Sequence, residues 1–113
     1  MIQLGLDSQE EENPELVKAV AGLCGGLYSG LCCGTLTGAA CLLSMYDKER
    51  AKLYMIPNLV EWFKATYTTL YGGIDCNCII GDNHDLRYER CPRIMEETFE
   101  KCRELLAEIG YEV

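Results

Sequence analysis

A long uncharged segment near the N-terminus constrains the fold more than any other feature of the sequence. No charged side chain occurs from Ala19 to Tyr46. A run of this length is formally long enough to cross a membrane. However, glycine, cysteine, serine and threonine dilute its hydrophobicity, and no basic cluster flanks either end. The segment therefore favours a helix buried at the centre of a small helical domain, and we do not expect a membrane span.

Glycine recurs at every fourth position of this segment. The positions are Gly22, Gly26, Gly30, Gly34 and Gly38. On a helix such positions stack in one row, where the missing side chains let another backbone approach closely. Since each glycine costs about 1 kcal/mol of helix propensity, the adjacent Gly25 and Gly26 predict a break. We expect a helix from Asn13 to about Cys24, a turn over residues 25–28 and a second helix from about Ser29 to Tyr46. In so short a chain the neighbour of the glycine row can be another subunit, which predicts a homodimer.

The rest of the chain also has the pattern of helices. Apolar residues at helical spacing run from Leu59 to Leu70, and Gly72 follows them as an end signal. Residues 72–91 are polar and predict a loop, after which Pro92 opens a last helix. No segment alternates as a strand would. The sequence predicts a single all-α domain over residues 1–113. We expect a small bundle of four to five helices around a Gly/Cys-rich buried central helix, with an acidic N-terminal segment 1–12 and a cysteine-bearing loop 72–91.

Charge and the N-terminal sequence narrow the function and the compartment. Eighteen acidic residues against ten basic ones give a net charge of −8. This balance repels phosphate backbones and anionic lipids, so we expect no nucleic-acid partner. Residues 1–17 contain no base and no basic-plus-apolar leader. We therefore expect a cytoplasmic protein.

The chain has eight cysteines, an abnormally high number for 113 residues. In a reducing cytoplasm many cysteines indicate metal binding or redox chemistry and not structural disulfides. Cys41 and Cys102 fall on apolar helical stripes and are expected in the core. Cys24 and Cys32 flank the glycine turn, and the sequence leaves their role open.

Three further cysteines fall in the polar stretch 72–91, where a thiol has no packing role. Cys76 and Cys78 form a C-x-C pair, which is a weak soft-metal chelate by itself. Cys91 directly precedes Pro92, so we expect it to cap the last helix, where the helix dipole favours a thiolate. His84 is the only histidine and is expected to be a loop residue. The spacing of a structural zinc site is missing.

Taken in order, these segments resemble the C_GCAxxG_C_C family of redox-active proteins. The matching features are Gly5-Leu6-Asp7, the helix Leu16 to Ala21, the glycine turn, Cys33-Gly34-Thr35-Leu36-Thr37-Gly38, the aromatic helix Leu59 to Leu70, Cys76 with Gly81, and Cys91. The resemblance covers most of the chain. It implies an all-helical fold and an iron–sulfur or thiol-redox role.

Two departures from the family pattern bear on the ligand set. The motif alanine is Thr35 here, and relatives usually carry their first cysteine on an earlier helix. We expect Cys33, Cys76 and Cys91 to converge as redox thiols, joined by one of Cys24, Cys32 or Cys78. The metal ligands expected on this basis are Cys33, Cys76, Cys91 and Cys78, and the glycines expected against a cofactor are Gly34 and Gly38.

The function expected from the resemblance has two forms. The protein transfers electrons through a cysteine-ligated iron–sulfur cluster, or it performs thiol–disulfide exchange with a redox partner protein that the sequence does not identify. The alternative is a non-catalytic helical module that binds zinc or another protein. The sequence has no C-x-x-C-H motif, so covalent haem is not expected.

Overall fold

The computed structural model describes residues 1, 6, 12–81, 83 and 85–111. Regular structure within these residues is helical, apart from one isolated β-bridge between Cys32 and Asp75. The predicted all-α class is therefore confirmed. Most of the acidic segment 1–12 and His84 lie outside the described residues.

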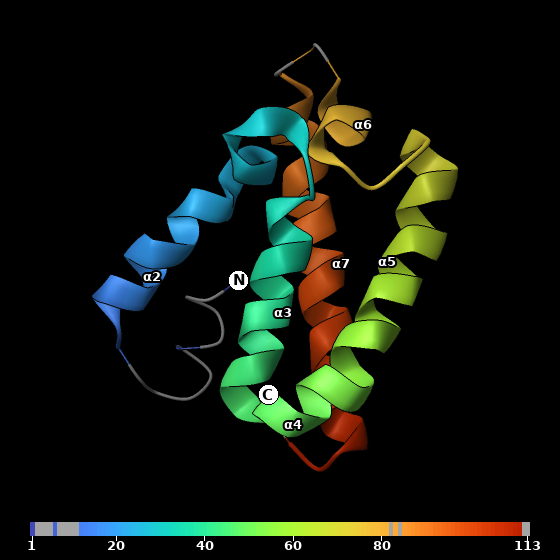
Figure 1. The fold of residues 1–113 in the computed structure, drawn as a ribbon. Coiled ribbons are helices and arrows are strands. Elements are labelled where there is room, and N and C mark those ends of the chain that lie inside the picture. The colour runs from blue at the N-terminus through green and yellow to red at the C-terminus, as the bar shows by residue number, and fades with distance from the viewer. Residues whose placement is uncertain (2–5, 7–11, 82, 84, 112–113) are drawn as a thin grey trace.

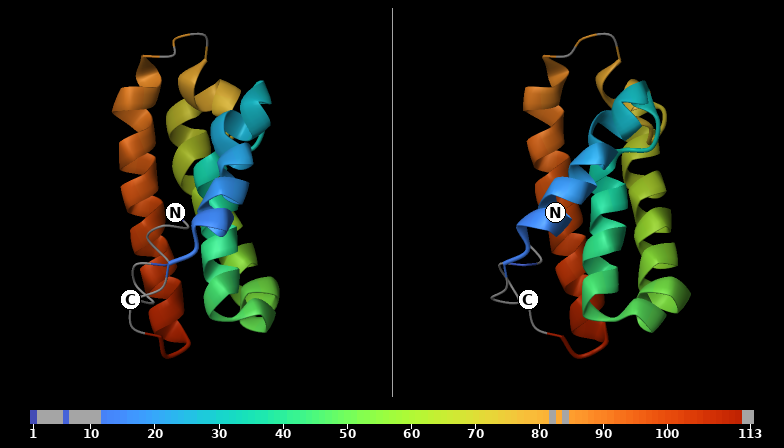
Figure 2. Two further views of the ribbon diagram at one scale, coloured as in Figure 1. Left: turned by 90° about the vertical axis from the view of Figure 1, so that its left-hand side faces the viewer. Right: turned by 60° about the vertical axis from the view of Figure 1, so that its left-hand side comes forward.

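Three long helices form the body of the molecule. These are α3 (Gly34–Tyr46), α5 (Ile56–Tyr71) and α7 (Leu86–Glu108). The shorter α-helices of the described residues are α2 (Pro14–Val20), α4 (Lys48–Arg50) and α6 (Cys76–Ile80). Helices α3, α5 and α7 run side by side, and α2 crosses the outside of this bundle at an angle (Figures 1 and 2). Short α6 lies at one end of the bundle, beside the start of α7 (Figure 1).

Helix α3 is the centre of the bundle, as the uncharged segment predicted. It contacts both α5 and α7. Its buried residues are Leu36, Gly38, Ala39, Leu42 and Leu43. Opposite them, α5 buries Leu59, Phe63 and Tyr67. In the described part of the chain, no helix combines the length and the apolar character that a membrane crossing requires.

The glycine turn is longer than predicted. The Asn13 side chain accepts a hydrogen bond from the backbone N–H of Leu16 at 3.1 Å, which confirms the predicted start of α2. That helix ends at Val20, however, and a single 3₁₀ turn continues it to Leu23. The backbone then adopts left-handed φ angles of 61°, 61°, 63° and 54° at residues 25–28. A right-handed helix cannot continue through left-handed angles, so the helical run ends here although the conformation is costly for Leu27 and Tyr28. Helix α3 therefore begins at Gly34 instead of Ser29.

The glycine row contacts segments of the same chain. A Cβ atom at Gly34 would lie 2.7 Å from the carbonyl oxygen of Leu23, and one at Gly38 would lie 3.3 Å from Cβ of Met1. Gly30 lies against the side chain of Asn77. These intramolecular contacts account for the small residue at positions 30, 34 and 38, and the homodimer stays a prediction.

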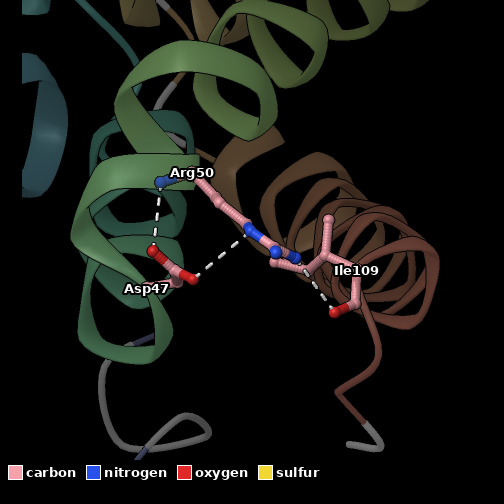
Figure 3. Close-up of polar contacts among 3 residues, drawn as sticks. All are labelled: Asp47, Arg50 and Ile109. Atoms are coloured by element: carbon pink, nitrogen blue, oxygen red, sulfur yellow. Dashed lines mark hydrogen bonds and ion pairs between the residues drawn. The ribbon is translucent and has the colours of Figure 1, made fainter.

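Polar contacts hold the opposite end of the bundle together. The Asp47 side chain accepts a hydrogen bond from the backbone N–H of Arg50 at 3.1 Å and so caps the start of α4. The Arg50 guanidinium in turn donates to the carbonyl oxygen of Ile109 at 3.3 Å (Figure 3). The corner after α3 is thereby linked to the end of α7. After this corner a π-helical turn, Ala51–Met55, leads directly into α5. Pro57 stands in the first turn of α5, and the helix continues through it.

The stretch 72–91 is not the loop that its polarity predicted. Gly72 ends α5 with a left-handed φ of 80°, as expected. After it, α6 and the first six residues of α7 occupy much of the stretch. Pro92 is therefore the seventh residue of α7, and the helix continues through it. Tertiary packing explains the difference, because Ile79 and Ile80 of α6 are buried in the core.

Candidate functional site

Four cysteines from four different segments line one cavity. The cavity measures about 260 Å³ and lies where residues 20–25, the start of α3, α6 and the first turns of α7 meet. The four are Cys24, Cys33, Cys76 and Cys91. Figure 1 shows these segments gathered at the α6 end of the bundle. The three cysteines predicted to converge all line this cavity, and of the three candidates for the fourth only Cys24 does so.

Gly34 allows Cys24 to approach Cys33. Cys24 follows the 3₁₀ turn, and Cys33 directly precedes α3. A Cβ atom at Gly34 would lie 2.7 Å from the Leu23 carbonyl oxygen and 3.4 Å from Cα of Cys24. Since both neighbours are backbone atoms that cannot rotate away, the close approach requires glycine at this position.

A short antiparallel backbone pairing joins the segment of Cys33 to the segment of Cys76. The N–H of Cys76 donates to the carbonyl oxygen of Leu31 at 2.7 Å, and the isolated bridge joins Cys32 to Asp75. The next residue along the first segment is Cys33, which is only 8% exposed. In this antiparallel pairing Cys76 lies opposite Leu31, and Cys33 and Cys76 flank the bridged pair on either side. Their side chains therefore lie on the same face of the pairing, and both line the cavity.

Cys91 reaches the cavity from α7. The neighbouring Arg90 donates a hydrogen bond to the carbonyl oxygen of Ile79 in α6. Its guanidinium carbon also lies 4.7 Å from the centre of the Tyr71 ring of α5, a cation–π contact. Arg90 thus links α7 to both α5 and α6 next to Cys91.

The predicted lowering of the Cys91 pKa is wrong. Cys91 lies inside α7 and not at its N-cap, so the free amides of a helix start do not face its sulfur. Burial instead raises the pKa of Cys91, with a further rise from Cys33 and Cys76. Burial and Cys33 raise the pKa of Cys76 in the same way, and Arg87 opposes the rise at both thiols. At neutral pH both groups therefore favour the neutral thiol.

The other four cysteines do not line the cavity. Cys32 is half-buried beside the β-bridge, and Cys78 is exposed with its sulfur against Gly73. Cys102 is fully buried, which confirms the predicted core position, and burial raises its pKa to about 12. Cys41 is half-buried on α3. Cys78, expected as a ligand with Cys33, Cys76 and Cys91, is thus placed apart from them.

The thiols that line the cavity are soft donors of the kind that bind metals and iron–sulfur clusters. Four thiols around one cavity match the number and type of ligands that iron–sulfur clusters use. Among the described His, Cys, Asp and Glu residues, no group of three or more is placed to hold one metal ion. Gly34 and Gly38, the predicted cofactor contacts, both line the cavity.

Arg87 also lines the cavity, and the sequence analysis missed it. It precedes Cys91 by four residues, so the two share one face of α7. The four-residue spacing of Arg87 and Cys91 indicates a shared helix face only if residues 86–91 are helical, and their polarity predicted a loop.

The fold and the cavity together define a small all-α protein with converging cysteines. A family model described as "Putative redox-active protein (C_GCAxxG_C_C)" matches residues 1–105. The chain therefore belongs to the C_GCAxxG_C_C family, as its motifs indicated. No curated protein and no solved structure matches it.

Proposed function

We propose that the protein transfers single electrons through an iron–sulfur cluster held by Cys24, Cys33, Cys76 and Cys91. The observation that carries the proposal is the convergence of these four cysteines, from four segments, on one cavity. Thiolates are the usual ligands of such clusters, which exchange electrons one at a time when bound. Membership of a family named for redox activity supports the same conclusion.

The protonation state of the thiols favours a cluster over thiol–disulfide exchange. Exchange requires a thiolate as the attacking group. Burial raises the pKa of both Cys76 and Cys91, so each is a weak nucleophile at neutral pH. Coordination to iron removes this obstacle, since metal binding displaces the thiol protons.

Apolar residues and glycines also line the cavity. Val20, Leu23 and Met95 contribute apolar surface to the lining. Gly34 keeps the Cys24 segment close to α3. We place the protein in the cytoplasm, where thiols stay reduced, with a redox protein that exchanges single electrons as its partner.

Anaerobic reconstitution tests the proposal. The reduced protein is incubated with ferric iron, sulfide and a thiol reductant, and in a parallel sample with zinc. Both samples are desalted and assayed for iron, acid-labile sulfide and zinc alongside their visible absorption. We expect iron and sulfide in comparable amounts and a visible absorption that dithionite bleaches. Binding of zinc without sulfide would support the zinc module instead. In a metal-free sample, formation of a disulfide with oxidised glutathione as the oxidant would support thiol exchange.

A further inference from the structure

Arg87 extends across the cysteine cavity. It is the only lysine or arginine among the described residues that line the cavity. A Cβ atom at Gly25 would lie 3.8 Å from its Nη2 atom. The guanidinium therefore reaches from α7 to the left-handed turn that follows Cys24, and its charge acts on Cys76 and Cys91.

A fixed positive charge at this place acts on electron transfer. Accepting an electron makes any redox site more negative, and a nearby cation stabilises that state. Arginine keeps its charge at every accessible pH. Arg87 is exposed, so water and salt screen its charge and weaken the effect.

We propose that Arg87 raises the reduction potential of the four-cysteine site by stabilising its reduced, more negative state. This inference rests on the proposed function of that site. Arg87 is a positioning residue: it does not bind the iron, and it acts through its charge on the cysteine ligands. Its influence on Cys76 and Cys91, where it opposes the rise in pKa, has the expected sign.

The test compares Arg87→Gln, Arg87→Lys and Arg103→Gln in the reconstituted protein. We expect Arg87→Gln to lower the equilibrium constant for reduction about tenfold, which is about 59 mV for a one-electron couple. Arg87→Lys keeps the charge and should restore most of the potential. Arg103→Gln removes the same charge from the same helix, but sixteen residues away, about 24 Å along α7, and should leave the potential unchanged.

A second measurement on metal-free protein makes the result independent of iron. Iodoacetate is anionic and iodoacetamide is neutral, so the ratio of their alkylation rates at Cys91 reports the local charge, whatever the thiolate fraction. We expect Arg87→Gln to lower this ratio about threefold relative to Arg103→Gln. An unchanged ratio, or an iron-loaded Arg87→Gln protein with the wild-type potential, would overturn the role of Arg87 and leave the proposed function standing. Wild-type protein that takes up no iron would overturn the proposed function, while the alkylation ratio still decides whether Arg87 supplies charge to the site.

Discussion

Serine in place of Cys33 or Cys76 is expected to reduce bound iron to background. The same replacement at Cys32 or Cys78 should leave iron binding intact. Each pair shares its local sequence, but only Cys33 and Cys76 line the cavity. A serine hydroxyl is a poor substitute for the soft thiolate that iron–sulfur chemistry selects. The measurement is iron and sulfide per protein after anaerobic reconstitution of the four variants.

Circular dichroism serves as the control for folding in this series. Cys33 is nearly buried, and a hydroxyl there can cost about 1–3 kcal/mol if it finds no hydrogen-bond partner. Helix content equal to that of the wild type separates loss of a ligand from loss of the fold. Iron retained in folded Cys33→Ser or Cys76→Ser, or lost in Cys32→Ser or Cys78→Ser, would contradict the assignment.

Alanine at Gly34 should both destabilise the protein and disturb the site. The added Cβ would meet the Leu23 carbonyl oxygen at 2.7 Å, so the 3₁₀ turn and Cys24 must move away from α3. Overpacking of this kind typically costs about 1–3 kcal/mol. We expect a loss of that size in the free energy of unfolding, measured by urea denaturation of the metal-free protein, together with weaker iron binding.

Gly22→Ala is the matched control for this variant. Gly22 lies in the adjoining 3₁₀ turn, has an ordinary φ, and has no atom within 4 Å of the position its Cβ would take. Its replacement should leave both the stability and the iron content nearly unchanged. Equal effects at Gly22 and Gly34 would show that the loss of glycine itself, and not the close approach to Leu23, is responsible.

The fold class could be predicted because the long helices carry regular apolar stripes. Leu59, Phe63 and Tyr67 recur at helical spacing, and all three are fully buried. The short helix α6 has no such stripe. Its two isoleucines, Ile79 and Ile80, are held by contacts with the rest of the core, and tertiary packing of this kind is not visible in local sequence.

Proline was misleading as a boundary signal. A proline usually stands in the first turn of a helix, which placed the start of α7 at Pro92 and made Cys91 its cap. The structure has six helical residues before it, so both the cap and the low pKa inferred from it were wrong. The left-handed angles at Leu27 and Tyr28 are equally unpredictable, since these residue types disfavour them.

Three members of the cysteine cluster could be predicted, but the fourth could not. Cys78 was the expected fourth ligand, with Cys24 and Cys32 as alternatives, but of these three only Cys24 lines the cavity. The choice depends on the close approach at Gly34, which brings the end of the 3₁₀ turn against α3. Such a contact between separate segments is a property of the folded chain alone.

Differential alkylation tests most directly whether four cysteines form one redox site. Reconstituted and metal-free proteins are treated anaerobically with a thiol reagent, and each cysteine is quantified by mass spectrometry. We expect the cluster to protect Cys24, Cys33, Cys76 and Cys91 together, while exposed Cys78 is modified in both samples. Protection of Cys78 or Cys32 in place of Cys24, or protection of fewer than the four cavity cysteines, would contradict the account.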